Sequence, residues 1–247
     1  MVAGGNIPFM REHTYFMWDP ALLCKKPVDP VTLNLLGETS PRPKTNPTMM
    51  PDAYLNTWSP VFLIRHPALV VPSMARACKK AYGWDLTHRS YLESGSFRTQ
   101  RLMYDWYADQ LASSGSAAGS KRPGANYPLV IDADDIIKDA STMRALNESL
   151  GLDPEKVLFE WKETPKEKIE AQRLAHKVFW SSVQGSSGIL LDKMAQGLTI
   201  EEEVPKWEKE WGVEGAQILK GYAEACMPDY EYLKGKRSFG LGATVAK

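Results

Sequence analysis

The sequence is poor in cysteine, and this shortage excludes two classes of protein. The 247 residues include three cysteines, Cys24, Cys78 and Cys226, with no Cys-x-x-Cys pair and no Cys/His cluster. An odd number of distant cysteines supports neither a disulfide framework nor a zinc site. We therefore expect them to be small apolar residues buried in a reducing compartment.

An excess of one charge sign and a long apolar run are also missing. Thirty Lys+Arg balance thirty Asp+Glu, so no global basic field favours nucleic acid as a partner. No apolar run approaches the roughly 20 residues that span a bilayer. The first residues, MVAGGNIPFMREH, lack the basic and apolar regions of a secretory leader. These absences predict a cytoplasmic protein that has no nucleic-acid or membrane partner.

What the sequence does contain is enough apolar material for a core. Hydrophobic residues make up 43% of the chain, and the length fits a single domain over residues 1–247. Nothing in the composition decides between a monomer and a homo-oligomer.

The most informative stretch is residues 61–77, VFLIRHPALVVPSMARA. Its first four residues are typical of a strand buried on both faces. Pro67 suits the first turn of a helix, and the apolar residues that follow have helical spacing. Arg65 would then lie at the carboxyl end of the strand, where open α/β sheets bind ligands. A cation beside a helix N-terminus predicts an anion site.

Other patterns predict a parallel α/β sheet with a helical C-terminal half. Further strands are expected at residues 6–13 (NIPFMREH) and 127–131 (YPLVI). After the latter, Asp134 or Asp135 is expected to cap a helix that runs to about Leu150. A metal site is the alternative interpretation of these aspartates, but partner ligands do not recur at a suitable spacing.

Helices and loops account for the rest of the prediction. Residues 25–60 are rich in proline and predict a long surface excursion, and residues 113–126 predict a flexible loop. Proline 228 is expected to interrupt the last helix. Helical spacing is found over residues 97–111, 166–183, 189–196, 200–210 and 213–232.

The central stretch resembles a known family. Arg65 and Ser73, with seven residues between them and an Ile-Arg-x-Pro context, are similar to the 3′-phosphate-binding motif of the sulfotransferase superfamily. The sequence motif FLIRHPxxxxPSM resembles that of fungal sulfotransferase-like proteins. This resemblance implies a P-loop-type α/β fold. It also implies that Arg65 and Ser73 bind the 3′-phosphate of the donor 3′-phosphoadenosine 5′-phosphosulfate (PAPS).

Further residues resemble parts of the same family. Arg11-Glu12-His13 is similar to a strand end of the form Lys-x-His. The resemblance makes His13 the general base and Arg11 the contact to the sulfuryl group. Arg11 stands where the family has Lys, so it keeps the positive charge but presents a planar guanidinium in place of an ammonium group. The alternative for His13 is a residue near the surface at a strand end. Lys234 and Lys236 partly resemble a basic loop that closes over the 3′-phosphate; the alternative is a solvated tail.

Three aromatic residues near the N-terminus have two interpretations. Tyr15, Phe16 and Trp18 form a dense patch with neighbouring leucines. Such a patch either lines a pocket for a small-molecule acceptor or belongs to the core.

The chain departs from the family pattern at the phosphosulfate loop. No G-x-x-x-x-G-K-[ST] or P-K-[ST]-G-[ST] pattern occurs, as expected if the first strand, loop and helix of the fold were absent. The resemblance nevertheless implies sulfuryl transfer from PAPS to a hydroxyl of a small apolar acceptor. The alternatives are a non-sulfating enzyme or small-molecule-binding protein of this fold, for example in secondary metabolism, or a truncated inactive homologue.

Overall fold

The structure is a computed structural model that describes residues 8–23, 33, 44–88, 90–91, 95–114 and 127–240. Most of the predicted flexible loop and much of the proline-rich excursion lie outside these residues. Within them, no helix is both long enough and apolar enough to cross a membrane.

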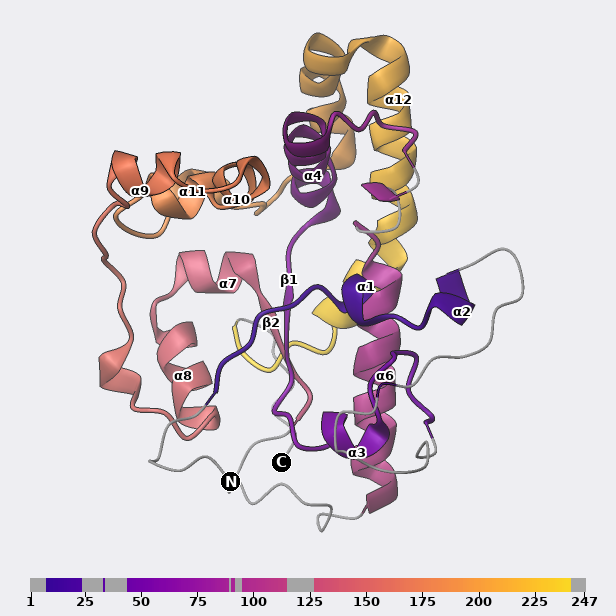
Figure 1. Cartoon of the computed structure of the whole chain (residues 1–247), viewed down its shortest axis with the longest axis vertical. Coiled ribbons are helices and arrows are strands. Elements are labelled where there is room, and N and C mark those ends of the chain that lie inside the picture. Colours follow the sequence, from indigo (N-terminus) through magenta and orange to yellow (C-terminus); the bar gives the residue numbers. More distant parts are fainter. Residues whose placement is uncertain are drawn as a thin grey trace.

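A two-stranded parallel sheet lies at the centre of the described fold (Figure 1). Strand β1 (Val61–Ile64) pairs with β2 (Leu129–Asp132), in a register that places Ile64 opposite Asp132. Both strands were predicted. The strand predicted at residues 6–13 does not form over residues 8–13. Pro8 has no N–H for a ladder, and Phe9 is 90% exposed, so this segment has no buried face to hold against a sheet.

The two strands differ in how they are buried. All of β2 is buried, with Val130 in the main core and Leu129 in a smaller cluster around Leu146. Strand β1 buries Phe62 and Ile64, whereas Leu63 is 56% exposed. The expectation of burial on both faces is therefore wrong for Val61–Ile64.

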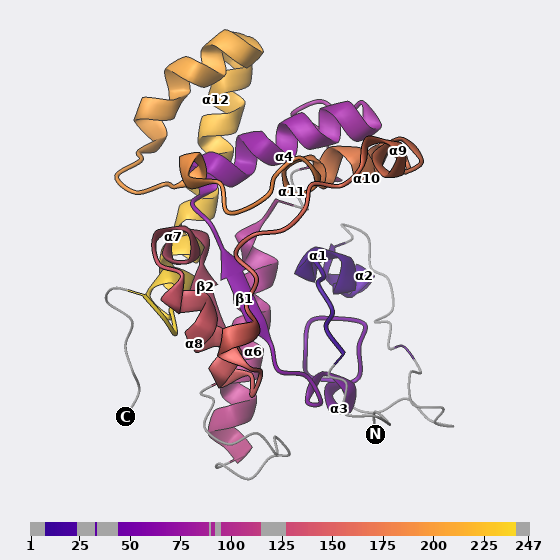
Figure 2. The ribbon, with the colours of Figure 1, turned by 90° about the vertical axis from the view of Figure 1, so that its left-hand side faces the viewer.

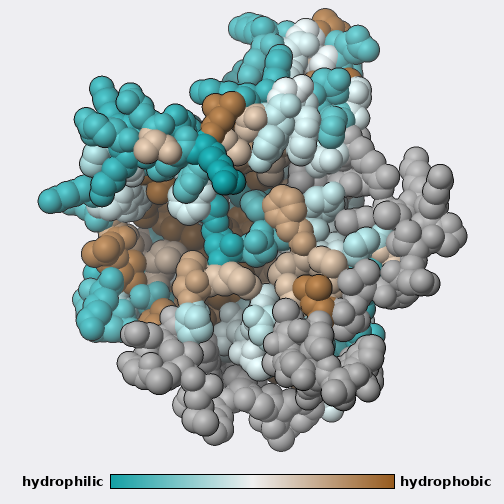
Figure 3. Space-filling model, in the orientation of Figure 1, coloured by the Kyte–Doolittle hydropathy of each residue, from teal (hydrophilic) through white to brown (hydrophobic). Residues whose placement is uncertain are grey.

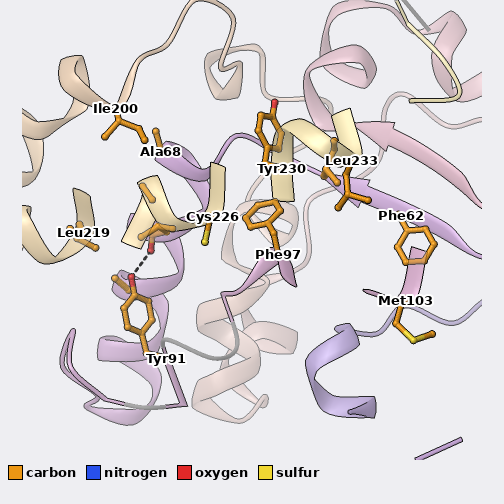
Figure 4. Close-up of a cluster of buried hydrophobic side chains, with 14 of the residues drawn as sticks. Phe62, Ala68, Tyr91, Phe97, Met103, Ile200, Leu219, Cys226, Tyr230 and Leu233 are labelled. Atoms are coloured by element: carbon orange, nitrogen blue, oxygen red, sulfur yellow. Dashed lines mark hydrogen bonds between the residues drawn. The ribbon is translucent and has the colours of Figure 1, made fainter. Parts of the chain in front are cut away.

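Helix α4 (Pro67–Tyr82) follows β1 after a two-residue turn, as predicted. The His66 side chain accepts the N–H of Ala68 at 3.2 Å and caps the helix. Gly83 ends the helix with φ +72°, a conformation that glycine adopts without strain. Helices α4 and α6 (Phe97–Ser114) both pack against α12 (Ile200–Lys234), and all three contribute to the main core, part of which is drawn in Figure 4.

Helix α12 consists of two halves that form a hairpin (Figure 1). Gly212, with φ +73° and ψ 171°, breaks the helix between them, close to the predicted boundary. A Cβ on Gly215 would lie 2.7 Å from the Trp211 Cβ, so the turn requires glycine there. Pro228 does not interrupt the second half, contrary to prediction. It lies on the exposed face, where water can satisfy the carbonyl that loses its partner.

The helices after β2 are shorter than predicted. Asp132, the last residue of β2, caps α7 (Ala133–Lys138) by accepting the Asp134 N–H at 3.1 Å, so the cap lies earlier than expected. Asp139 accepts the N–H of Ser141 at 2.8 Å, which begins a separate helix, α8 (Ser141–Ser149).

The remaining elements are short. Residues 166–183 form three helices where one was predicted, and residues 189–196 keep only one 3₁₀ turn. These elements are α9 (Lys166–Glu170), α10 (Leu174–Phe179), α11 (Ser181–Gln184) and η2 (Leu191–Lys193), with η1 (Pro154–Lys156) before them. The N-terminal part contributes α1 (Thr14–Met17), α2 (Pro20–Leu23) and α3 (Asp52–Leu55). In Figure 2, α1 and α7 lie on opposite sides of the two strands.

Candidate functional site

A cleft of about 590 Å³ opens at the carboxyl ends of the two strands. Its walls come from the end of β1, the end of β2 with α7, the segment 194–199 and the last turns of α12. Open α/β sheets place ligands at this edge. The cleft therefore lies at the sheet edge where the sequence predicted a ligand, although Arg65 itself is not among its lining residues. We name it the strand-end cleft.

A buried Asp–Tyr pair lines the cleft. The Tyr230 hydroxyl donates to Asp132 Oδ2 at 3.0 Å, and the Asp134 N–H donates to Asp132 Oδ1 at 3.1 Å. Asp132 is 2% exposed and Tyr230 3% exposed. Burial raises the pKa of Asp132, although the two donated bonds oppose the shift. Burial also raises the pKa of Tyr230, and the Asp132 charge adds to this effect. Tyr230 is thus a neutral phenol bonded to a carboxylate.

His66 lies beside this pair as a neutral hydrogen-bond donor. Its Nδ1 accepts the Ala68 N–H, so in the neutral ring the proton is on Nε2. Its ring meets the Tyr230 ring edge-to-face, with the centroids 5.3 Å apart. Burial, with the charge of Lys234 as the next cause, lowers the pKa of His66. A ring held in this tautomer is unsuited to act as a general base.

Arg65 directly follows the carboxyl end of β1, as predicted, and has a spare donor. Its Nη2 donates to the Lys193 carbonyl at 2.7 Å, while its buried Nε has no partner among the described residues. Burial lowers the pKa of Arg65, and the charges of Asp134 and Asp132 oppose this shift. A desolvated guanidinium with an unpaired N–H suits an anionic ligand.

The backbone at the start of α4 contributes less than the sequence suggested. Pro67 has no N–H, and Ala68 donates to the His66 ring. The N–H groups of Leu69 and Val70 both donate to the His66 carbonyl, at 3.0 and 3.2 Å. These amides are occupied, so an anion at this turn would depend on the Arg65 side chain rather than on the helix N-terminus.

The other residues predicted to bind the donor are separated. Ser73 is exposed on α4, and no hydrogen bond joins it to Arg65 within the described residues. Lys234 lines the strand-end cleft, with its Nζ 5.2 Å from the Tyr230 ring centroid. Lys236 does not line it; its Nζ lies 5.5 Å from the Tyr232 ring. The two lysines therefore do not act as one pair.

Neither of the predicted catalytic residues lines the strand-end cleft. His13 is exposed, its backbone N–H donates to Glu12 at 2.8 Å, and its ring contacts Phe16 edge-to-face. The Arg11 guanidinium lies over the Trp180 ring, 4.5 Å from its centroid. Because His13 precedes α1, it does not end a strand beside Arg65. The roles assigned to both residues stay predictions.

The three aromatic residues of the predicted acceptor pocket have different environments. Trp18 is buried in the main core, so the core interpretation applies to it. Tyr15 is partly buried, and Phe16 is 60% exposed. Figure 3 shows the apolar side chains on the face of Figure 1 as several small groups between polar ones. None of the three residues lines the strand-end cleft.

A buried ion pair supports one wall of the cleft. Arg237 Nη1 lies 3.0 Å from Asp135 Oδ2, and both side chains are less than one-fifth exposed. Asp134 accepts the N–H of Ala195 at 2.9 Å, which fixes the segment before α12. Within the described part of the chain, no group of three or more His, Cys, Asp or Glu residues is arranged to bind a metal ion.

Three residues of the cleft were not assigned from the sequence: His66, Asp132 and Tyr230. The first two directly follow or end predicted strands, so their positions at the sheet edge were available as a signal. Tyr230 had no such signal, because its position depends on how the second half of α12 returns to the sheet.

Two known proteins are similar to the chain. Sulfotransferase ppzF of Metarhizium majus (strain ARSEF 297) is 32% identical over 244 residues, which cover 94% of this chain and 70% of that protein. Sulfotransferase ppzF of Metarhizium rileyi (strain RCEF 4871) is 32% identical over 245 residues, with the same coverage. No family model matches the chain. No solved structure matches it.

Proposed function

The chain belongs to the sulfotransferase family, and on that premise we propose that it transfers a sulfuryl group from PAPS to a hydroxyl of a small apolar acceptor. Sulfotransferases need a sulfate donor, and the choice of PAPS follows the resemblance of the Arg65–Ser73 motif. The acceptor is assigned to the strand-end cleft, where Met194, Leu198 and Met227 supply apolar surface.

The observation that carries the proposal is the state of Arg65. It lies at the carboxyl end of β1, is desolvated, and has a buried Nε–H without a partner among the described residues. A charge-assisted hydrogen bond to phosphate would satisfy this donor. Ser73, exposed on α4, is the second residue that the motif assigns to the 3′-phosphate.

Within the cleft, Lys234 is the cation assigned to the reacting end of the donor. A positioned cation stabilises the negative charge that develops as the sulfur–oxygen bond to the donor breaks. Holding donor and acceptor together supplies a further part of the rate enhancement. The proposal assigns no backbone loop to the sulfuryl group, because no phosphosulfate-loop pattern occurs in the sequence.

Calorimetric titration with 3′-phosphoadenosine 5′-phosphate, the product of the donor, tests this assignment. Arg65→Ala should weaken binding about 10- to 100-fold, since a hydrogen bond to a charged group contributes roughly 1.5–3 kcal/mol. Arg76→Ala is the matched control: it removes a cation from α4 that is exposed and paired with Glu210 at 2.7 Å. Equal affinity for wild type and Arg65→Ala would contradict the proposal.

One observation favours a second candidate, a non-sulfating member of the family. Carboxylates outnumber Lys and Arg in the cleft lining, where Asp132, Asp134, Asp135, Glu201 and Glu231 face Lys138, Lys234 and Arg237. This balance favours a cationic or neutral ligand over an anionic donor. A thermal-shift comparison separates the candidates: the nucleotide should stabilise a sulfotransferase, whereas stabilisation by apolar amines alone would favour the binding protein.

A further inference from the structure

We infer that Asp132, acting through Tyr230, is the general base that takes the proton of the acceptor hydroxyl, in place of His13. The inference rests on the proposed function and adds to it the residues that move the proton. It follows from the joint position of the two side chains in the strand-end cleft.

The geometry of the pair suits a relay. Asp132 is fixed at Oδ1 by the Asp134 N–H, which leaves Oδ2 to accept the Tyr230 hydroxyl at 3.0 Å. The Tyr230 oxygen still has a lone pair that can accept the acceptor O–H. Figure 4 shows the Tyr230 hydroxyl pointing away from Phe97 and the rest of the drawn core cluster. Both residues line the cleft.

The step balances without any further reactant. As the acceptor oxygen forms its bond to sulfur, its proton passes to Tyr230 Oη, and the Tyr230 proton passes to Asp132 Oδ2. The bond between sulfur and the bridging phosphate oxygen breaks, and its electron pair leaves with 3′-phosphoadenosine 5′-phosphate. Proton transfer by a positioned base contributes typically about 10²- to 10⁴-fold to such a rate.

The other basic groups in the cleft are less suitable. His66 uses Nδ1 to accept a backbone N–H. Asp134 accepts the N–H of Ala195, and Asp135 is paired with Arg237. The remaining lining carboxylates, of Glu201 and Glu231, are exposed to water. Among the lining carboxylates that the structure describes, Asp132 is the one that accepts a hydrogen bond from a tyrosine hydroxyl.

The surroundings of Asp132 affect its pKa and therefore the expected pH dependence of activity. Desolvation raises the pKa of Asp132, and the charges of Asp134 and Asp135 act in the same direction. Arg65 and His66 face it from the end of β1, and Tyr230 faces it from α12. Activity should therefore fall as the pH drops through the raised pKa of Asp132.

The test compares acceptors that differ in their need for a base. The 247-residue chain is given PAPS at pH 8 with either 4-nitrophenol, which is largely ionised at that pH, or benzyl alcohol, which is not. Asp132→Asn should lower the rate with benzyl alcohol about 100-fold or more and leave the rate with 4-nitrophenol within about threefold. It should also abolish the acidic limb of the pH profile with benzyl alcohol. The asparagine retains the oxygen that caps α7.

Two further variants keep the test decisive. Tyr230→Phe preserves the packing and should lower the benzyl alcohol rate at least about tenfold, which decides the case even if Asp132→Asn does not fold. His13→Ala should leave both rates within about twofold. Equal loss with both acceptors would mean a structural role and would overturn the inference, as would a large loss in His13→Ala.

Calorimetry with 3′-phosphoadenosine 5′-phosphate separates this inference from the proposed function. Wild type that fails to bind it overturns the proposed function. Wild type and Asp132→Asn that bind it equally, with a loss confined to benzyl alcohol, support the relay. Wild type that binds the nucleotide but transfers no sulfuryl group to either acceptor contradicts the relay.

Discussion

Two Arg–His groups in this chain carry the same chemistry in different surroundings. Arg65 and His66 follow β1; His66 is buried and Arg65 is partly buried, and they have fixed bonds to Lys193 and Ala68. Arg11 and His13 lie in an N-terminal segment that is exposed, and their ring contacts are to Trp180 and Phe16. The first group lies at the edge of the sheet where ligands bind, and the second does not.

The difference teaches that the residue types alone do not make a site. A neighbouring buried strand sets the position of Arg65 and His66, because the carboxyl ends of parallel strands meet at one edge. No strand forms around Arg11, since Phe9 and Met10 are exposed and give the segment no buried face. Pre-organisation of a polar group thus comes from the apolar residues beside it.

The largest effect is expected where a cation supports the cleft wall. Arg237→Ala should lower the free energy of unfolding by about 2–3 kcal/mol, because it leaves Asp135 buried without its partner. Urea denaturation measures this loss. The double variant Asp135→Asn/Arg237→Ala should recover part of it, since the uncompensated charge is gone. A loss below about 0.5 kcal/mol in Arg237→Ala would show that the wall does not depend on this pair.

A smaller effect concerns the two histidines. Burial lowers the pKa of His66 below its ordinary value of 6.5, so below pH 6.5 the unfolded state binds more protons than the folded state. Stability should consequently fall as the pH drops from 6.5 toward the lowered pKa of His66. Protonation would also turn Nδ1 from an acceptor into a donor facing the Ala68 N–H.

Melting temperatures at several pH values between 7 and 5 check this expectation. His66→Asn keeps an acceptor at the start of α4 and should flatten the loss of stability on acidification. His13→Asn is the matched control at the exposed position and should leave the pH dependence as in wild type. If melting temperature fell with pH equally in His66→Asn and wild type, the link between His66 protonation and stability would be contradicted.

Local sequence patterns predicted the parts of the fold that local physics determines. The apolar runs VFLI and YPLVI predicted both strands, and Pro67 with Gly83 predicted the start and end of α4 closely. The acidic start of α12 is a capping box in which Thr199 and Glu202 bond reciprocally. The break before Val213 follows from Gly212, whose positive φ other residues adopt only with strain.

The candidate site was predicted only where it lies next to a strand. Arg65 followed from its strand, whereas Tyr230 reaches Asp132 across 98 residues of sequence through the hairpin of α12. No local periodicity encodes such a contact, which depends on tertiary packing. The strand predicted around His13 does not form over residues 8–13, because burial is decided by what the fold places against a segment and Phe9 there is exposed.

The smallest effect is expected at Arg11, where the contrast is sharpest. The resemblance assigns Arg11 to the sulfuryl group, whereas the structure places its guanidinium over Trp180, 4.5 Å from the ring centroid. Since Trp180 is 37% exposed, this cation–π contact should contribute roughly 0.5–1 kcal/mol.

Arg11→Gln should therefore lower the free energy of unfolding, measured by urea titration, by no more than this amount. It should leave kcat within about twofold. Trp180→Leu should cause a loss of similar size, and the double variant should lose little more than either single one, because both remove the same contact. If Arg11→Gln instead lowered kcat about tenfold or more while Trp180→Leu kept the kcat of wild type, Arg11 would contact the sulfuryl group as the resemblance implies. The exposed N-terminal segment would then be part of the site.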